Sequence, residues 1–385
     1  MKAFFKVFSI GAIFLLLVGF VYQSYTTYVD SSSFVKSGEM FDVGGYSLYV
    51  EDYGTGKVNV IFDSGMGDDL SVWNKVADEV SKFSRVITYD RAGLGWSEKS
   101  PKQRDGNTII EELYSILGQK NVEGPIVLVG HSFGGVNMQL YALTYPENIS
   151  ALVLVDSAHE KQINKMPRTG LLLKYVFKGG MLAAPFGLPR LYLSNSDPEE
   201  RAKKSTTKHQ FTSLDEANYF PQSLTQLDAL NPNYGDLPLV VIARNHPSHE
   251  IQNKNTKNYI WAELQESLAS RSTDSTLIFT GEPQHSIHKV QPEIVIEAIQ
   301  IEGHTDSDGS IYDNLSLSTR RSREAYFVMS SEVADFLGYK NIRQQPVISV
   351  SGYGEDRPIK QNISKENKAE NRRIDIRLIM YTPKN

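Results

Sequence analysis

A serine in the sequence GHSFGG, residues 130–135, is the strongest candidate for chemistry in this chain. The motif follows a buried apolar run and precedes a helical pattern, which is the setting in which G-x-S-x-G forms a sharp strand-to-helix turn. Gly130 and Gly134 permit the close backbone packing of such a turn. Ser132 is then lifted above the sheet, at the positive end of the following helix. The spacing therefore predicts a nucleophilic serine.

Two backbone N–H groups are expected to face the negative charge that forms when this serine attacks a carbonyl group. Phe133 directly follows the serine, and its N–H points to the place where such an oxyanion would develop. A second N–H comes from a loop after an earlier strand, and the sequence SGMG at residues 64–67 has that position. Met66 is the predicted second donor.

Short apolar runs alternate with helical patterns along the middle of the chain. We expect strands at residues 45–52, 58–62, 85–89, 125–129, 151–155, 237–243 and 276–280, and helices at 108–117, 136–145, 259–269 and 292–299. Such alternation is typical of a doubly wound, mostly parallel sheet covered on both faces. It stops between about residues 160 and 236, which predicts an inserted helical cap that sets substrate choice. An apolar cluster in this insertion, residues 171–177, is expected to pack against the core.

From residue 37 to residue 299 the sequence resembles an α/β-hydrolase-fold protein. The resemblance rests on pieces in a fixed order: VGGYSLYVEDYGTG, DSGMG, YDRAGLGWS, LVGHSFGG, LVDSAHE and HSIHKVQPEIVIEAI. It implies an α/β fold and a Ser, an acid and a His in that chain order. Within YDRAGLGWS, the turn at residues 90–93 is expected to shape the floor of the site without taking part in chemistry.

The resemblance places the catalytic base after the last strand of the sheet, where His285 and His288 both lie. His285 fits the family position better, and His288 is the alternative. The acid has two candidates. In most relatives it follows the strand that is residues 239–243 here, and the nearest carboxylate is then Glu250. In others it lies one strand earlier, where Asp156 ends an apolar run, and we expect Asp156.

Together these residues imply the transfer of an acyl group to water. Ser132 attacks a carbonyl carbon after His285 takes its proton, and a water activated by His285 then releases the acyl group. No metal or organic cofactor is required. A serine nucleophile argues against the chemistry of epoxide hydrolases and haloalkane dehalogenases, which have a similar fold but use aspartate. A small carboxylic ester is the expected substrate, and a lactone, thioester or small amide fits the same mechanism.

Beyond residue 300 the sequence resembles another family, the OmpA-like peptidoglycan-binding domain. Three ordered motifs carry this resemblance over residues 301–380: IEGHTDSDG, VSGYGEDRPI and NKAENRRIDIRL. It implies a small α+β unit over residues 300–385. In that unit, Asp306 and Arg321 would hold the amine and carboxylate of the diaminopimelate in cell-wall peptides through charge-assisted hydrogen bonds. Peptidoglycan is therefore an expected partner.

The two resemblances compete for residues 276–299. An OmpA-like unit normally begins with a strand and a helix before its first motif, but here the first sheet needs those elements. A polar linker, which usually marks a domain boundary, is also missing. We therefore expect a partial OmpA-like domain that lacks part of its core, as a gene fusion or an artificial chimera would produce.

Residues 1–30 have the pattern of an export signal or membrane anchor. Lys2 and Lys6 precede and flank an uncharged apolar run from Val7 to Tyr22, and no A-x-A cleavage pattern follows it. Apolar residues cover every face of this predicted helix, which is unlike a helix packed on a soluble core. We expect an uncleaved inner-membrane anchor, with the rest of the chain facing the periplasm of a bacterial cell envelope.

The composition excludes several classes of protein. The 385 residues include 40 Lys and Arg against 45 Asp and Glu, a net charge of −5 that does not indicate a nucleic-acid binder. The chain has no cysteine, so disulfides, thiolate nucleophiles and cysteine-bound metals are excluded. Two functions remain: a membrane-anchored serine hydrolase with a cell-wall-binding tail, or a non-catalytic peptidoglycan-anchoring envelope protein that uses the hydrolase fold as a scaffold.

Overall fold

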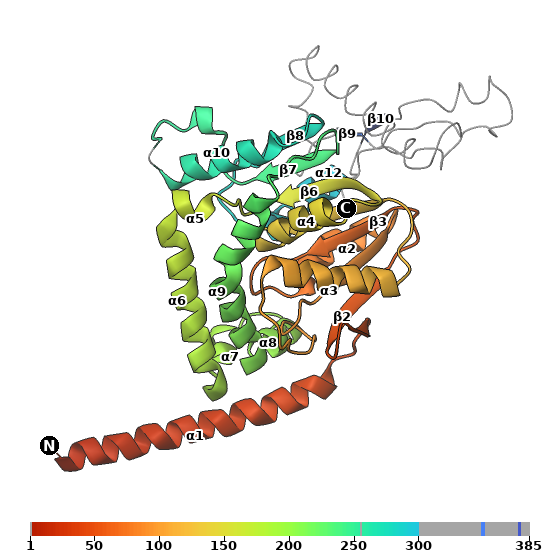
Figure 1. Ribbon diagram of the computed structural model, residues 1–385. Helices are drawn as coiled ribbons and strands as arrows, with labels where there is room; N and C mark the ends of the chain where they lie inside the picture. The colour runs from red at the N-terminus through yellow and green to blue at the C-terminus, as the bar shows by residue number, and fades with distance from the viewer. Residues whose placement is uncertain (1, 255, 300–347, 351–375, 379–385) are drawn as a thin grey trace, which may run out of the picture. The chain divides into compact units, whose positions relative to one another are not determined.

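The computed structural model describes residues 2–254, 256–299, 348–350 and 376–378. The chain divides into two units, residues 1–290 and residues 291–385. The first unit contains a sheet, a layer of helices on it and an inserted helical cap (Figure 1). All the catalytic residues that the first of the two resemblances predicts belong to this unit.

An eight-stranded sheet forms the centre of the first unit. Its strands are β1 (Glu39–Asp42), β2 (Ser47–Tyr53), β3 (Asn59–Asp63), β4 (Arg85–Tyr89), β5 (Ile126–His131), β6 (Ile149–Val155), β7 (Leu239–Ala243) and β8 (Ser275–Phe279), in the order β1-β2-β4-β3-β5-β6-β7-β8. β1 and β2 are antiparallel to their neighbours, and all the others run parallel. Every residue of β3, β5 and β7 is buried, because helices cover both faces. The predicted doubly wound, mostly parallel sheet is confirmed.

Helical segments follow most strands of this sheet, and two of the helices begin at capping side chains. The segments are α2 (Asn74–Val80), α3 (Gly106–Gln119), α4 (Phe133–Thr144), α10 (Lys257–Ala269) and α11 (Ile287–Val290), with the short 3-10 helices η1 (Leu70–Trp73) and η3 (Ser248–Glu250). Asp105 caps α3 and Thr256 caps α10, each accepting a hydrogen bond from a first-turn N–H. α4 packs on β5 and β6, and α10 packs on β7 and β8.

Six further helical segments lie between β6 and β7, and we call them the cap. They are α5 (Gln162–Lys165), α6 (Pro167–Ala183), η2 (Ala184–Phe186), α7 (Leu188–Tyr192), α8 (Pro198–Lys204) and α9 (Thr207–Ala229). α6 packs along α9, and α9 in turn packs on α3 and α4 (Figure 1). The apolar cluster of α6 was expected to pack against the core. That expectation is wrong for Leu172, Tyr175 and Val176, which are 61–66% exposed.

The N-terminal helix α1 (Lys2–Ser33) projects from the rest of the first unit (Figure 1). Residues Phe4–Ser33 have a mean hydropathy of 2.4 in their most apolar window, and that window is not buried inside the protein. By length and composition it is long and apolar enough to cross a membrane. Its C-terminal half contacts η2 and α8 of the cap.

The second unit contains α12 (Pro292–Ile299) and an antiparallel pair of strands, β9 (Ile348–Val350) and β10 (Ile376–Leu378). Asp306 and Arg321, the predicted peptidoglycan ligands, lie outside the described residues.

Candidate active site

Ser132 occupies a strained turn between β5 and α4. Its backbone has φ 53° and ψ −113°, values that a non-glycine residue rarely adopts. The turn also requires small flanking residues: a Cβ on Gly130 would lie 2.5 Å from the Gly134 carbonyl oxygen, and one on Gly134 would lie 2.3 Å from the Asp63 carbonyl oxygen. This is the geometry that places a nucleophilic serine above the end of a central strand.

Three predicted side chains form one hydrogen-bonded line. His285 Nε2 lies 3.0 Å from Ser132 Oγ, and His285 Nδ1 lies 2.5 Å from Asp156 Oδ2. Ser132 follows β5, Asp156 follows β6, and His285 follows β8, so three separate segments meet at the carboxyl edge of the sheet. In this order a carboxylate orients the imidazole, and the other ring nitrogen can take the serine proton.

Asp156 is completely buried, and other donors hold its second oxygen. Trp261 Nε1–H donates to Oδ1 at 2.7 Å, and the Arg244 backbone N–H donates to the same atom at 3.2 Å. Burial alone would raise the pKa of Asp156. The hydrogen bond and charge of His285, with contributions from Arg244 and Trp261, hold that pKa below its usual value. The carboxylate is therefore ionised at neutral pH.

The two alternatives from the sequence lie elsewhere. Glu250 is 54% exposed in η3, where its carboxylate lies 3.4 Å from His246. His288 is fully buried, with its ring against Trp73 at a centroid distance of 4.4 Å. Neither of these side chains is within hydrogen-bond distance of Ser132 or His285 among the described contacts.

The predicted oxyanion donors have free N–H groups. Among the hydrogen bonds of the described residues, none engages the backbone N–H of Met66 or of Phe133. Phe133 is the first residue of α4, so its N–H also lies at the positive end of a helix. The neighbouring Gly67 N–H, in contrast, donates to Glu216 at 2.9 Å. Both N–H groups therefore remain free to bind an acceptor, as the predicted oxyanion role requires.

Arg91 fixes the loop that carries Met66. Its buried guanidinium donates to the carbonyl oxygens of Ser64 and Gly65, each at 2.7 Å. It also pairs with Asp63 at 2.6 Å and with Glu216 of α9 at 2.7 Å. The turn containing Arg91 was predicted to shape the floor of the site, and these contacts agree with that role. Sequence analysis did not predict Glu216, which ties the cap to the same loop from 125 residues away.

His131 and His288 form a buried imidazole cluster behind the site. The His131 ring lies 4.6 Å from the His285 ring and 4.4 Å from the His288 ring, between centroids. His131 Nε2–H donates to the His285 backbone carbonyl at 3.0 Å, which holds the loop of the base in place. Burial, together with the charge of His285, lowers the pKa of His131 to about 3. Burial, with His131 beside it, lowers the pKa of His288 well below its usual value.

Replacing His288 with phenylalanine is expected to make the protein less sensitive to acid. Both His288 ring nitrogens lack a hydrogen-bond partner among the described residues, so the ring stays neutral when folded and gains a proton on unfolding below about pH 6.5. Protonation therefore favours the unfolded chain as the pH falls. Between pH 7.5 and 5, wild type should lose about 2 kcal/mol more unfolding free energy than His288→Phe. Urea unfolding followed by tryptophan fluorescence measures this.

His249 provides the control for the loss of an imidazole, because its side chain is 78% exposed. His249→Phe should keep the wild-type pH profile of unfolding. Parallel profiles for wild type and His288→Phe would contradict the assignment of a neutral buried ring.

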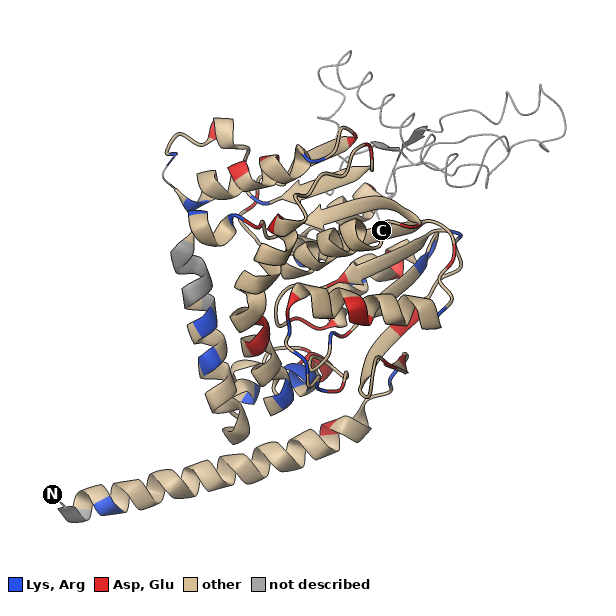
Figure 2. Cartoon of the chain, viewed as in Figure 1, with Lys and Arg blue, Asp and Glu red and all other residues tan. Residues whose placement is uncertain are grey.

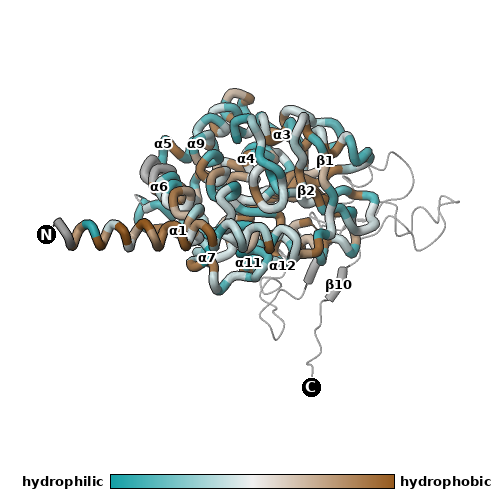
Figure 3. Tube along the Cα trace, turned by 90° about the horizontal axis from the view of Figure 1, so that it is seen from below, coloured by the Kyte–Doolittle hydropathy of each residue, from teal (hydrophilic) through white to brown (hydrophobic). Residues whose placement is uncertain are grey.

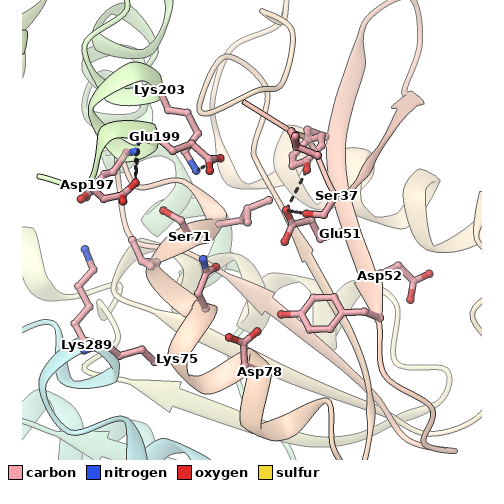
Figure 4. Close-up of a pocket in the computed structure, with 17 residues that line it drawn as sticks. Ser37, Glu51, Asp52, Ser71, Lys75, Asp78, Asp197, Glu199, Lys203 and Lys289 are labelled. Atoms are coloured by element: carbon pink, nitrogen blue, oxygen red, sulfur yellow. Dashed lines mark hydrogen bonds and ion pairs between the residues drawn. The ribbon is translucent and has the colours of Figure 1, made fainter. Parts of the chain in front are cut away.

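A separate cavity of about 630 Å³ lies between β2, η1, α2 and α8 (Figure 4). Some polar groups of its lining are paired: Lys203 contacts Asp69 at 2.9 Å and Glu199 at 3.5 Å, and Ser37 donates a hydrogen bond to Glu51. Ser132, Asp156 and His285 do not line it. Within the described part of the chain, no group of three or more His, Asp or Glu side chains is placed to hold a metal ion.

Comparison with protein families gives two matches. A model of the alpha/beta hydrolase fold matches residues 58–186, and a model of the OmpA family matches residues 282–372. Among solved structures, the Cif epoxide hydrolase from Acinetobacter nosocomialis covers 73% of this chain and 95% of its own, with a TM-score of 0.58 and 15% identity. The chain carries an alpha/beta hydrolase fold joined to an OmpA-family segment. The OmpA match includes His285, so both parts use this stretch of sequence.

Sequence relatives of the hydrolase fold include uncharacterised proteins and named hydrolases. The uncharacterized protein YqjL of Bacillus subtilis is 28% identical over 246 residues, which are 64% of this chain and 83% of that protein. Lipase LipV of Mycobacterium tuberculosis is 32% identical over 113 residues, 29% of this chain and 42% of the lipase. The putative carbamate hydrolase RutD of Azorhizobium caulinodans is 29% identical over 113 residues, with the same two coverages. The fold and these relatives support a hydrolase.

Proposed function

We propose that this chain is a membrane-anchored serine hydrolase that cleaves carboxylic esters through Ser132, His285 and Asp156. The observation that carries the proposal is the continuous line of hydrogen bonds from Ser132 Oγ through the His285 ring to Asp156. The strained backbone of Ser132 supports it further, because such turns expose a serine nucleophile at the end of a central strand.

The reaction begins when Ser132 Oγ attacks the ester carbonyl carbon and His285 Nε2 takes the serine proton. Asp156 holds His285 in the tautomer with a proton on Nδ1 and stabilises the ring when it becomes charged. The negative charge on the former carbonyl oxygen is stabilised by the N–H groups of Met66 and Phe133. His285 gives its proton to the leaving alcohol. Water then attacks the acyl-enzyme, with His285 again as the base, and releases the acid.

The N-terminal helix and the OmpA-family segment support a location in a bacterial cell envelope. An α1 helix that crosses the inner membrane, with the lysines of its first turns in the cytoplasm, leaves the hydrolase unit in the periplasm. The OmpA-family segment would then attach to peptidoglycan, with Asp306 and Arg321 binding the zwitterionic diaminopimelate.

Labelling with a fluorophosphonate probe tests the enzymatic proposal without knowledge of the natural substrate. The probe reacts with serines that an adjacent base activates. We expect stoichiometric modification of the full chain in detergent, with the added mass on the peptide that contains Ser132. Heat-denatured protein is the control and should not react. Modification at other serines, or equal labelling of Ser132→Ala, would contradict the proposal.

A further inference from the structure

α1 is fixed to the cap by polar contacts along one face of the helix. Gln23 is buried, and its amide donates to the Ser205 carbonyl at 2.8 Å and accepts from Arg190 at 2.9 Å. Arg190 also pairs with Asp30 at 2.6 Å. Gly19, on the same face, packs so tightly that a Cβ there would lie 2.6 Å from the Phe186 carbonyl oxygen. These contacts set the direction in which the rest of α1 leaves the cap.

The free part of α1 is too short to cross a bilayer by itself. Residues Phe4 to Val18 project as an exposed apolar helix (Figure 3). At 1.5 Å per residue this segment is about 22 Å long, whereas the hydrocarbon core of a bilayer is about 30 Å thick. A spanning α1 must therefore include the turn from Gly19 to Tyr22, which lies against η2. The membrane surface consequently reaches the cap.

The outer face of α6 carries exposed apolar side chains on this side of the unit. Leu172, Tyr175, Val176 and Leu182 are 59–66% exposed, and their spacing places them along one face of the helix. α6 lies on the side from which the N-terminal half of α1 projects (Figures 1 and 3). Apolar side chains scattered singly on a surface need no explanation, but a continuous helical stripe beside a spanning helix does.

The charge around this stripe also fits a lipid surface. The sequence has no acidic residue from Gln162 to Tyr192. Lys174 and Lys178 are exposed on α6 (Figure 2), and long lysine side chains can reach the phosphates of a neighbouring lipid surface. A helix with apolar and basic residues, and Tyr at its boundary, is the type that lies in the plane of a membrane interface.

The inner face of the same helix approaches the catalytic loop. A Cβ on Gly67 would lie 3.2 Å from the Phe177 ring, so α6 touches the loop that carries Met66. His209 and Glu216 of α9, the helix along which α6 packs, hydrogen-bond to Gly67 as well. One helix thickness, about 10 Å, therefore separates the outer stripe from the loop of the oxyanion donors.

We propose that the outer face of α6 lies in the headgroup region of the bilayer that α1 spans, and that the substrate is a long-chain acyl ester that enters the site from this bilayer. The proposal rests on the membrane anchoring and ester hydrolysis proposed above. The cap is then the element that transfers a lipid-dissolved ester from the membrane to Ser132.

Spin labelling of the full chain in vesicles tests the membrane contact independently of catalysis. Because the chain has no cysteine, Leu172→Cys and Val176→Cys each give one labelling site, and Leu230→Cys at the C-terminal end of α9 is the exposed control. In vesicles of phosphatidylcholine and phosphatidylglycerol, collisions with oxygen relative to a water-soluble nickel chelate should be at least about fivefold higher at 172 and 176 than at 230. An equal ratio of the two collision rates at all three positions would overturn the membrane contact. So would spin labels at 172 and 176 that neither reagent reaches before vesicles are added.

Kinetics with two esters test the route of the substrate. The double variant Leu172→Glu, Val176→Glu should hydrolyse a long-chain p-nitrophenyl ester dissolved in vesicles about tenfold more slowly than wild type, because two charged side chains keep α6 out of the interface. Its rate with water-soluble p-nitrophenyl acetate should not change. An equal effect on both esters would overturn the route from the bilayer. Wild type that hydrolyses neither ester would refute the proposed function, while the spin-label ratios still decide the contact.

Discussion

Replacing Ser132 with alanine is expected to lower kcat/KM for p-nitrophenyl butyrate by about 10⁴- to 10⁶-fold. The serine oxygen forms the acyl-enzyme, and its proton has an acceptor 3.0 Å away in His285 Nε2. Without that oxygen, water must attack the ester directly, and the oxyanion donors and binding contacts alone remain to stabilise the transition state. The loss corresponds to about 5–8 kcal/mol of transition-state stabilisation.

The same substitution should leave the fold intact. Alanine and serine have the same steric cost at the φ of 53° that this position requires, so the melting temperature should shift by less than about 2 °C. Ser150→Ala is the matched control, because Ser150 is buried at the opposite end of β6 and donates to the Ile126 carbonyl. It should retain wild-type turnover. Equal ester turnover in wild type and Ser132→Ala would remove the serine from the mechanism.

The local parts of this site were predictable from contiguous sequence. The turn around Ser132 requires a strand, two close-packed glycines and a helix within about a dozen residues, and all of these leave a pattern in the chain. The parallel strands were predictable for a similar reason, since each is a short apolar run between turn residues, whereas the largely exposed edge strand β1 (EMFD) was not predicted. β4 has the predicted bounds, and β3 and β8 are each shifted along the chain by one residue from the predicted range.

The sequence left two candidates for the catalytic acid, because the choice between them depends on how distant segments meet. Asp156 and Glu250 each follow a strand that ends at the same edge of the sheet, so position along the chain does not separate them. The structure brings Asp156 to His285 and surrounds it with Trp261 and Arg244, which come from α10 and the loop after β7. These partners have no local sequence pattern that marks them.

Contacts of the cap were beyond sequence analysis for the same reason. Glu216 lies in the middle of α9, where a carboxylate is usually solvent-exposed, yet it is completely buried against Arg91. Helical spacing in α6 predicts a stripe of apolar side chains, but it does not say whether that stripe faces inward or outward. The exposed positions of Leu172 and Val176 follow from the packing of the opposite face of α6 on α9.

Replacing Asp156 with asparagine is expected to lower kcat by about 10⁴-fold at neutral pH, with little change in structure. Asp156 Oδ1 accepts from Trp261 and from the Arg244 backbone, so the amide oxygen of asparagine should keep that place. The amide nitrogen must then face His285 Nδ1, where it donates a hydrogen bond. Nδ1 consequently becomes an acceptor, and the ring proton moves to Nε2, where it blocks removal of the Ser132 proton.

Glu250→Gln is the matched control, because it makes the same chemical change at the other candidate acid. Glu250 is 54% exposed and lies beside His246, so its replacement should change kcat by less than about twofold. Steady-state kinetics with a soluble ester compare the two variants directly. Loss of activity in Glu250→Gln with activity retained in Asp156→Asn would mean that η3 moves to the imidazole in the working enzyme. The buried partners of Asp156 argue against this. They hold an ionised carboxylate inside the protein, which costs free energy, and orienting His285 is the function that would explain it.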